Sequence, residues 1–236
     1  MHYIRFAVSL HKIRGTSVNK TKVMRLLFCI TFGLQYLCTQ MQTIREFRMA
    51  QTTDAPIVAR LIMDAMTEEC CQYYYGSDHS LEDFHTLLTE LVERDDTQYS
   101  YRNTICAIAE DGQVAGICVS YDGGQLLTLR QAFVTEVKKR FGRDFSNMPA
   151  ETEAGELYID SMAVIPHLRG RGGGKQLFRA VEKRAKQLGL NTLGLLVDRG
   201  NPDAERLYRS IGYRHVGDTE WGGHLLKHMQ KELDPK

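Results

Sequence analysis

Residues 157 to 174, LYIDSMAVIPHLRGRGGG, decide the fold of this chain. Leu157 to Val164 is an apolar run of the kind that favours a β-strand, and Pro166 cannot donate to a sheet ladder, so we expect the strand to end there. A glycine-rich turn comes next. Beyond it, apolar residues recur at helical spacing from Leu177 to Leu188. The stretch therefore predicts a strand, a glycine loop and a helix.

Three glycines, Gly172 to Gly174, stand where this helix begins. They let the backbone approach a ligand closely, and the unpaired N–H groups and positive dipole end of a helix favour an anion such as phosphate. A nucleotide P-loop does not fit, because it requires Gly at 169 and Ser or Thr at 176, where the chain has Arg169 and Gln176. A dinucleotide fingerprint does not fit either, because Lys175 and Leu177 occupy its last glycine position.

The loop does match the pattern Arg/Gln-x-x-Gly-x-Gly/Ala, through Arg169, Gly172 and Gly174. This pattern resembles the acyl-CoA pyrophosphate loop of the GNAT superfamily of N-acetyltransferases. A second segment, NPDAERLYRSIGY at residues 201 to 213, resembles that family's Asn-x-x-Ala-x-x-Leu-Tyr-x-x-x-Gly-Phe/Tyr motif. The glycines of a single loop could equally serve only to allow tight packing of the helix. Two motifs in the expected order, however, strongly favour the family. The resemblance covers about residues 43 to 231.

The resemblance implies an α/β fold, a single domain in which helices flank a central, twisted, mixed sheet. It also implies acetyl-CoA as the co-substrate, no metal, and direct attack by a primary amine in a ternary complex. Backbone groups near Met162 and Val164 would hold the pantetheine arm, and one N–H there would polarise the thioester carbonyl. The residues expected to bind the cofactor are Met162, Val164, Arg169, Gly170, Arg171, Gly172, Gly173, Gly174, Lys175, Asn201 and Tyr208.

Three residues are candidates for catalysis. Tyr208 occupies the position of the family's general acid, and a phenol is fully protonated at neutral pH, although packing of the helix is an alternative role. Glu156 and Asp160 share one face of the predicted strand with Tyr158. Either carboxylate could take the proton of the acceptor ammonium, directly or through water. Asp160 is the more notable, because an ionised carboxylate in an apolar strand is costly unless paired or hydrated.

The composition is that of an ordinary globular protein, with 236 residues, 43% hydrophobic content and a net charge of +1. No global field therefore recruits nucleic acid or an anionic membrane. The six cysteines lack paired CxxC units, and the histidines lack a metal-ligand spacing. Cys106 and Cys118 fall in apolar runs and are expected in the core. We assign no role to the histidines.

Residues 1 to 40 differ from the rest, being basic at first and then apolar from Leu26 to Cys38. This run is too short for a confident membrane span, and no small-x-small cleavage site comes after it. We expect an N-terminal extension outside the fold, for example from a misplaced start before Met41, with a signal or membrane anchor as the alternative. The domain is then expected at 41 to 236, in the cytoplasm.

The rest of the chain predicts further elements around the glycine loop. A strand near Thr43, a helix from Ala55, a helix capped by Ser80 and a hairpin turning at Asp111 and Gly112 precede it. Residues 122 to 155 depart from the common family pattern as an insertion with a helix from Gln125 to Phe141. We expect Leu126 and Phe133 of this insertion to roof the acceptor pocket, with a merely packed decoration as the alternative. Tyr73 to Tyr75 either shape that pocket or cover a helix junction.

The chain is therefore expected to be an acetyl-CoA-dependent N-acetyltransferase. A noncatalytic acyl-CoA-binding sensor on the same fold is the alternative, because fold alone does not fix function. Its partner is expected to be a small amine, without nucleic acid or stable membrane association of the domain, and it would act as a monomer or homodimer. The sequence leaves the identity of the amine open.

Overall fold

The computed structural model describes residues 43–221 and 224–234. The strands in this part of the chain form a seven-stranded sheet in the order β1-β2-β3-β4-β5-β7-β6. β4 and β5 are parallel, and every other neighbouring pair is antiparallel. The prediction of a mixed α/β sheet flanked by helices is confirmed. The strands are β1 (Ile44–Met49), β2 (Thr104–Ala109), β3 (Val114–Asp122), β4 (Leu157–Val164), β5 (Thr192–Asp198), β6 (Arg214–Trp221) and β7 (His224–Glu232).

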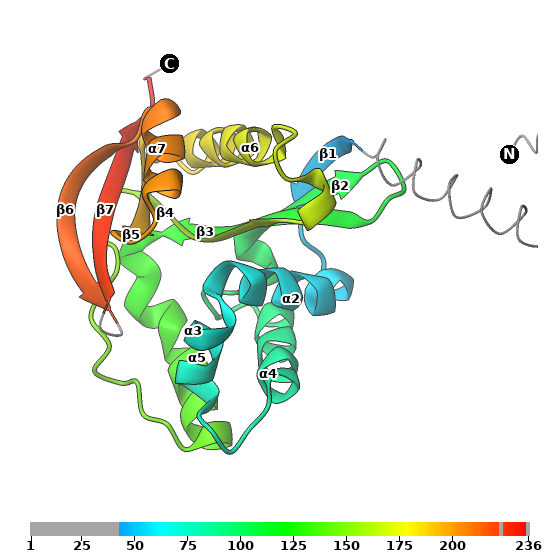
Figure 1. The fold of residues 1–236 in the computed structure, drawn as a ribbon, viewed down its shortest axis with the longest axis vertical. Coiled ribbons are helices and arrows are strands. Elements are labelled where there is room, and N and C mark those ends of the chain that lie inside the picture. Colours follow the sequence, from blue (N-terminus) through cyan, green and yellow to red (C-terminus); the bar gives the residue numbers. More distant parts are fainter. Residues whose placement is uncertain (1–42, 222–223, 235–236) are drawn as a thin grey trace, which may run out of the picture. The chain divides into compact units, whose positions relative to one another are not determined.

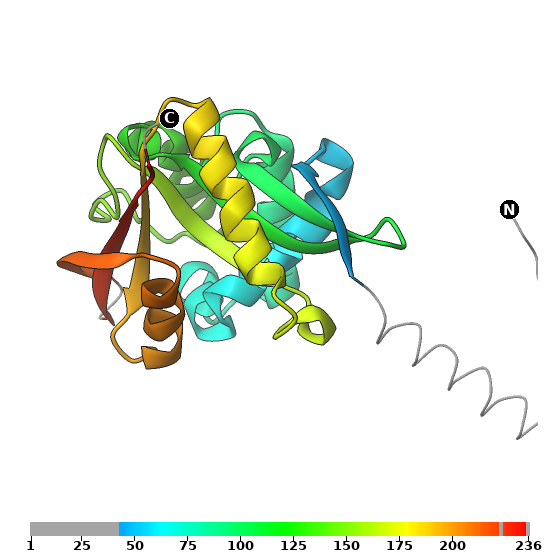
Figure 2. The same cartoon turned by 90° about the horizontal axis from the view of Figure 1, so that it is seen from above.

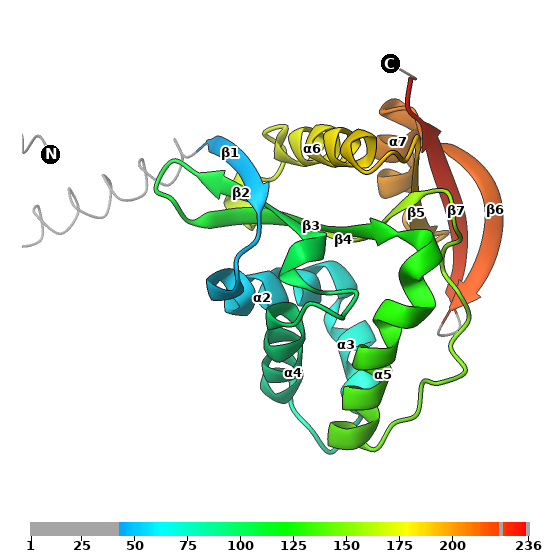
Figure 3. The same cartoon turned by 180° about the vertical axis from the view of Figure 1, so that it is seen from behind.

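Helices cover both faces of this sheet (Figures 1 and 3). α6 and α7 lie on one face, and Figure 2 shows α6 crossing the central strands. The other four helices lie on the opposite face. The helices are α2 (Ala55–Met66), α3 (Glu68–Tyr75), α4 (Leu81–Glu93), α5 (Leu126–Phe141), α6 (Gly173–Gln187) and α7 (Pro202–Ser210). The expectation for residues 1 to 40 falls outside the described part of the chain.

Two apolar cores, one on each face, hold these layers together. Alternate residues of the central strands face opposite sides of a sheet. Cys106 of β2 and Ile117 of β3 accordingly join the core with α2 and α4, whereas Cys118 joins the core under α6. Both cysteines are fully buried, which confirms their expected core role. Among residues 43–221 and 224–234, no helix is long and apolar enough to cross a membrane.

The helix that comes after Ser80 begins as predicted. The Ser80 hydroxyl accepts a hydrogen bond from the Asp83 backbone N–H, and the Asp83 carboxylate accepts one from the Ser80 N–H in return. This reciprocal pair satisfies two donors at the helix start. The preceding helix α3 was not predicted. Thr67, with a φ of 73°, separates α3 from α2, and its hydroxyl accepts from the Cys70 N–H.

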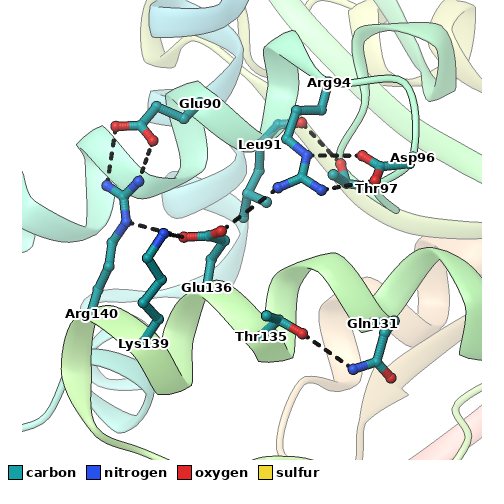
Figure 4. Close-up of polar contacts among 10 residues, drawn as sticks. All are labelled: Glu90, Leu91, Arg94, Asp96, Thr97, Gln131, Thr135, Glu136, Lys139 and Arg140. Atoms are coloured by element: carbon teal, nitrogen blue, oxygen red, sulfur yellow. Dashed lines mark hydrogen bonds and ion pairs between the residues drawn. The ribbon is translucent and has the colours of Figure 1, made fainter.

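α5 is an integral part of the layer of helices that includes α2, α3 and α4. Its buried face includes Leu126, Phe133 and Val137. On the outside it is tied to α4, because Arg140 pairs with Glu90, and Glu136 pairs with Arg94 (Figure 4). The segment from 122 to 155 is therefore packed and ion-paired against the rest of the domain.

Candidate functional site

A cavity of about 460 Å³ lies where β4 and β5 diverge. The two strands pair only from Leu157–Leu193 to Ile159–Leu195, although both are described to their ends. Beyond that point their facing edges separate. The cavity occupies this gap, and its walls come from both faces of the sheet: the end of α2 and α3 on one side, α6 and α7 on the other. Two reactants bound in this gap would meet between the strands.

Asp160 reaches this cavity because β4 carries a β-bulge. Val119 of β3 pairs with Ser161, and Ser120 pairs with Ile159, so Asp160 is the extra residue on β4. A bulge re-aims side chains and shifts the alternation of the strand. Leu157 and Ile159 before it face the α6 core, and Met162 after it faces the same core. The bulge therefore places Asp160 at the opening between the strands.

Three side chains donate hydrogen bonds to the Asp160 carboxylate. The Tyr121 hydroxyl and the Gln98 Nε2 reach Oδ2 at 2.8 and 3.2 Å, and the Ser161 hydroxyl reaches Oδ1 at 2.9 Å. Burial raises the pKa of Asp160, and these donors, together with the charge of Arg130, offset only part of that rise. A held carboxylate with a raised pKa binds a proton more readily than an exposed one, which is a property of a general base.

Tyr208 lines the same cavity from α7. Its ring stacks edge-on against Phe178 of α6 at 5.9 Å and lies 6.0 Å from the ring of Tyr213. Burial is the main cause that raises the pKa of Tyr208, so its hydroxyl stays protonated at neutral pH. The structure thus places at one cavity Asp160, which can accept a proton, and Tyr208, which can donate one.

The glycine loop has the geometry of a ligand cradle. Gly170 and Gly172 have φ of 73° and 85°, a region that other residues rarely adopt. A Cβ on Gly173 would come within 2.8 Å of the Ile44 side chain, so this glycine allows α6 to pack on β1. A Cβ on Gly174 would meet nothing within 4 Å. Gly174 therefore leaves room for a ligand beside the first turn of α6, and the start of a helix suits a phosphate.

The remaining cofactor candidates divide into two groups. Met162 and Asn201 line the cavity, and the Asn201 Oδ1 also accepts from the Ala204 N–H, so it caps α7. Val164 and Arg169 lie outside the cavity walls, at the end of β4. There the Arg169 Nε donates to the Val164 carbonyl at 2.7 Å. Gly170 and Arg171 are exposed on the loop, and Lys175 is exposed in the first turn of α6.

Glu156 is not part of the cavity wall. It is fully buried against Gly194, where a Cβ on that glycine would collide with its carboxylate. It accepts from His228 and Gln230 of β7 at 3.0 and 2.8 Å, and from Thr152. Burial alone would raise the pKa of Glu156, but these hydrogen bonds outweigh burial and lower it. The structure thus separates Glu156 from Asp160, and only Asp160 faces the cavity.

The expectation that Leu126 and Phe133 roof the acceptor pocket is wrong. Leu126 is buried with Tyr121 and Tyr158, and Phe133 is buried among Tyr74 and Tyr99. Neither side chain lines the cavity. The 3.6-residue apolar pattern located the buried face of α5 correctly, but such a pattern does not say which surface that face covers.

Sequence reasoning left the role of Tyr73 open and did not name Cys70 or Trp221 as cavity residues. The three tyrosines of α3 divide: Tyr74 and Tyr75 are in the core, whereas Tyr73 is 44% exposed and lines the cavity. Cys70 lies beside it, and burial raises the pKa of its thiol to about 12, so it is neutral. Trp221 of β6 closes the same wall, with its ring 5.6 Å from that of Tyr73. No motif marks these positions in the sequence.

The charged groups on the cavity wall are predominantly acidic. Glu69 of α3, Asp160 and Asp198 of β5 contribute carboxylates. His224 joins them, and its Nδ1 lies 2.9 Å from Asp198 Oδ2. Among the described residues, no lysine or arginine lines the cavity. The same part of the chain also contains no group of three or more ligand side chains arranged for a metal ion. The wall therefore favours a cationic guest.

The mixed sheet, the opening between β4 and β5, and the glycine loop at the start of α6 fit a group-transfer protein of the acyltransferase class. The comparisons with known proteins agree. The model of the acetyltransferase (GNAT) family matches residues 63–213. The chain belongs to this family. A search of curated proteins found no match.

Two solved structures illustrate the similarity. A crystal structure of an acetyltransferase shares 31% identity, with a TM-score of 0.65, over 80% of this chain and all of that one. An N-acetyltransferase from Staphylococcus aureus Mu50 shares 22% identity, with a TM-score of 0.66, over 79% of this chain and all of that one. The family and the fold support acetyl transfer as the general activity.

Proposed function

We propose that this chain is an N-acetyltransferase that moves the acetyl group of acetyl-CoA to a small cationic primary amine. Direct attack takes place while both substrates are bound. One observation carries the proposal: Asp160 and Tyr208 line a single cavity in the gap between β4 and β5, although they come from different elements. A proton acceptor and a proton donor are the two groups that this transfer requires.

The glycine loop is the proposed site of the acetyl-CoA phosphates. Gly174 leaves space for close approach, and the unpaired N–H groups at the start of a helix are suited to bind an anion. Arg169 and Lys175 add positive charge at the surface beside it. Met162 and Asn201, at the cavity wall, are placed to hold the pantetheine arm that leads from the loop to the gap.

The proton steps are assigned to the two side chains. The acceptor enters as an ammonium, and Asp160 takes one of its protons. The freed nitrogen lone pair attacks the thioester carbonyl, the C–S bond breaks, and Tyr208 gives its proton to the departing thiolate. The attacking nitrogen loses a second proton to solvent as the amide forms. The products are the acetylated amine, CoA and one released proton, and solvent returns the proton from Asp160 to Tyr208.

The acidic cavity supports a cationic acceptor. Glu69, Asp160 and Asp198 create a negative potential that raises the local concentration of a cation. The rings of Tyr73 and Trp221 offer faces on which an ammonium or its carbon chain can lie. A volume of about 460 Å³ suits a small molecule.

The test is release of CoA thiol from acetyl-CoA with a panel of small amines, with mass spectrometry to identify the acetylated product. We expect Asp160→Asn to lower kcat/KM about 100-fold to 10,000-fold, the usual contribution of a positioned base. Asp78→Asn, at an exposed position between α3 and α4, is the matched control. Wild-type activity in Asp160→Asn removes it as the base. Tight acetyl-CoA binding without thiol release for any amine supports the sensor alternative.

A further inference from the structure

The shell around Asp160 depends on α5 and the loop after it. We propose that Arg130 and Glu151 form a buried charge pair that sets the proton affinity of Asp160, acting as positioning residues for the proposed acetyl transfer. This inference rests on the proposed function only in giving Asp160 the role of base. Neither residue lines the cavity, so each acts through Asp160 and its shell.

Arg130 is a charged side chain inside the domain. It is only 4% exposed on the inner face of α5. Its Nη1 donates to the Pro149 carbonyl at 2.8 Å, and its Nη2 lies 3.1 Å from Glu151 Oε1. A buried guanidinium is costly unless it is paired. Contacts within the segment between β3 and β4 therefore hold Arg130 and Glu151 in place as a pair.

Two paths connect the segment that carries this pair to Asp160, one through Glu151 and one through the backbone of α5. The Tyr158 hydroxyl reaches Glu151 at 3.4 Å, and the Tyr158 ring packs edge-on at 5.8 Å against Tyr121, which donates to Asp160. On the second path, the Gln98 N–H donates to the Leu129 carbonyl of α5 at 3.2 Å, while the Gln98 amide holds Asp160. α5 thus positions two of the three donors to the carboxylate.

The tyrosines and the cysteine that surround Asp160 are neutral near pH 7. Burial raises the pKa of Tyr74, Tyr99, Tyr121 and Tyr158 well above the ordinary value, and it raises the pKa of Cys70 to about 12. Glu69, Asp198 and His224 reach the cavity from its outer rim, where water screens them. Arg130 and Glu151 are therefore the ionisable neighbours whose charges act within the interior.

The two charges act on Asp160 in opposite directions. Arg130 favours the ionised carboxylate of Asp160. Burial and the charge of Asp160 raise the pKa of Glu151 to about 7, and an ionised Glu151 in turn opposes ionisation of Asp160. Such effects are large in the interior because the local dielectric is low. Burial makes Asp160 bind a proton more readily than an exposed carboxylate does, and the pair adjusts that affinity.

The experiment measures the titration of Asp160 directly, by carbon NMR of its labelled carboxyl group, assigned with Asp160→Asn. Removing the negative charge with Glu151→Gln should lower the titration midpoint of Asp160. Removing the positive charge with Arg130→Gln should raise it. We expect shifts of roughly one pH unit, at the lower end of what a nearby charge produces. The acid limb of the kcat/KM profile should move in the same directions.

Arg140→Gln and Glu136→Gln are the matched controls, because they remove the same charges from the outer face of α5, where Arg140 and Glu136 pair with α4 and each other (Figure 4). They should leave the Asp160 titration unchanged, whatever they do to the melting temperature. If Arg130→Gln does not fold, Glu151→Gln decides alone.

The outcomes separate the inference from the proposed function. An Asp160 midpoint that does not move in folded Glu151→Gln overturns the inference, even if Asp160→Asn is inactive. A midpoint that moves while the acid limb of kcat/KM stays fixed supports the inference and shows that Asp160 is not the base. Equal shifts in the control variants also overturn it, because they would indicate a general effect of charge on α5.

Discussion

Tyr208 and Tyr213 are neighbours in one aromatic cluster and differ in what their hydroxyl groups face. Tyr208 lines the cavity, whereas the Tyr213 hydroxyl is buried and has no hydrogen-bond partner among the described residues. Both rings pack on Phe178. Removing the hydroxyl group from each tyrosine in turn therefore distinguishes a chemical role of the hydroxyl group from a packing role of the ring.

We expect Tyr208→Phe to lower kcat about 100-fold to 10,000-fold while acetyl-CoA affinity, measured by calorimetry, stays within about twofold. The ring and its packing remain, and only the proton donor is lost. Tyr213→Phe, as control, should keep wild-type turnover and melting temperature. Equal activity of both variants under conditions where chemistry limits the rate would leave Tyr208 with a packing role only.

At the scale of elements, α5 determines how much of the segment after β3 can be changed. Phe133 is fully buried against Tyr74 and Tyr99, whereas Leu127 on the same helix is 69% exposed. Replacing the whole segment by a short turn would remove Phe133 and Val137 from the core. Point substitutions are therefore the sharper probe of this helix.

We expect Phe133→Ala to reduce the free energy of unfolding by about 3 to 5 kcal/mol, because it leaves a cavity among packed rings. Leu127→Ala should change it by less than about 0.5 kcal/mol, as is usual at the surface. Urea unfolding of the two variants gives the comparison. A small effect of Phe133→Ala would mean that α5 is a loosely attached decoration.

The order and type of most elements could be predicted from the sequence, because each had a local signal. Pro166 ended β4, Asp111 and Gly112 marked the β2–β3 turn, and Ser80 began α4. α3 had no such signal, because its cysteines and tyrosines do not form a clear apolar period. Its start at Thr67 depends on a positive φ that a β-branched residue rarely adopts.

The candidate site was predictable only in part. Asp160, Tyr208, Met162 and Asn201 were named from motif and strand position, and all four line the cavity. Glu156 was grouped with Asp160 because the alternation of residues along a strand predicts which side chains share a face of the sheet. The alternation does not show whether such a side chain meets a neighbouring strand or a cavity. Gln98, Arg130 and Glu151 come from distant segments, and their meeting depends on tertiary packing.

At the scale of the whole molecule, Glu156 joins parts of the sheet that are remote in the chain. Glu156 lies at the start of β4, and its side chain extends over Gly194 of β5. Its carboxylate accepts hydrogen bonds from His228 and Gln230 of β7. It therefore ties the C-terminal hairpin, which carries Trp221, to the centre of the sheet. This position favours a structural role for Glu156.

We expect Glu156→Gln to reduce the free energy of unfolding by about 1.5 to 3 kcal/mol at pH 7, the range for hydrogen bonds to a charged group. The pKa of Glu156 is lowered in the folded state, so its contribution is present above the ordinary glutamate pKa and is lost as pH falls through the folded value. The stability difference from wild type should therefore shrink in acid.

Thermal unfolding from pH 3 to pH 7 measures this difference, with the exposed Glu220→Gln as control. Assays of turnover on the same samples complete the test. A variant with wild-type stability and a large loss of kcat would return Glu156 to the catalytic candidates.

The Arg130–Glu151 pair also limits how this protein can exchange parts with its relatives. Segments between strands are where homologous domains vary most in length, and they are common points for recombination. Here a crossover between β3 and β4 would carry Arg130, Glu151 and the anchor of Gln98 together, while Asp160 stays on the recipient strand. In such a chimera the donor segment would supply Arg130 and Glu151, and the recipient would supply Asp160. The pH range in which the chimera works would then come with the transplanted helix and not with the strand that bears the carboxylate.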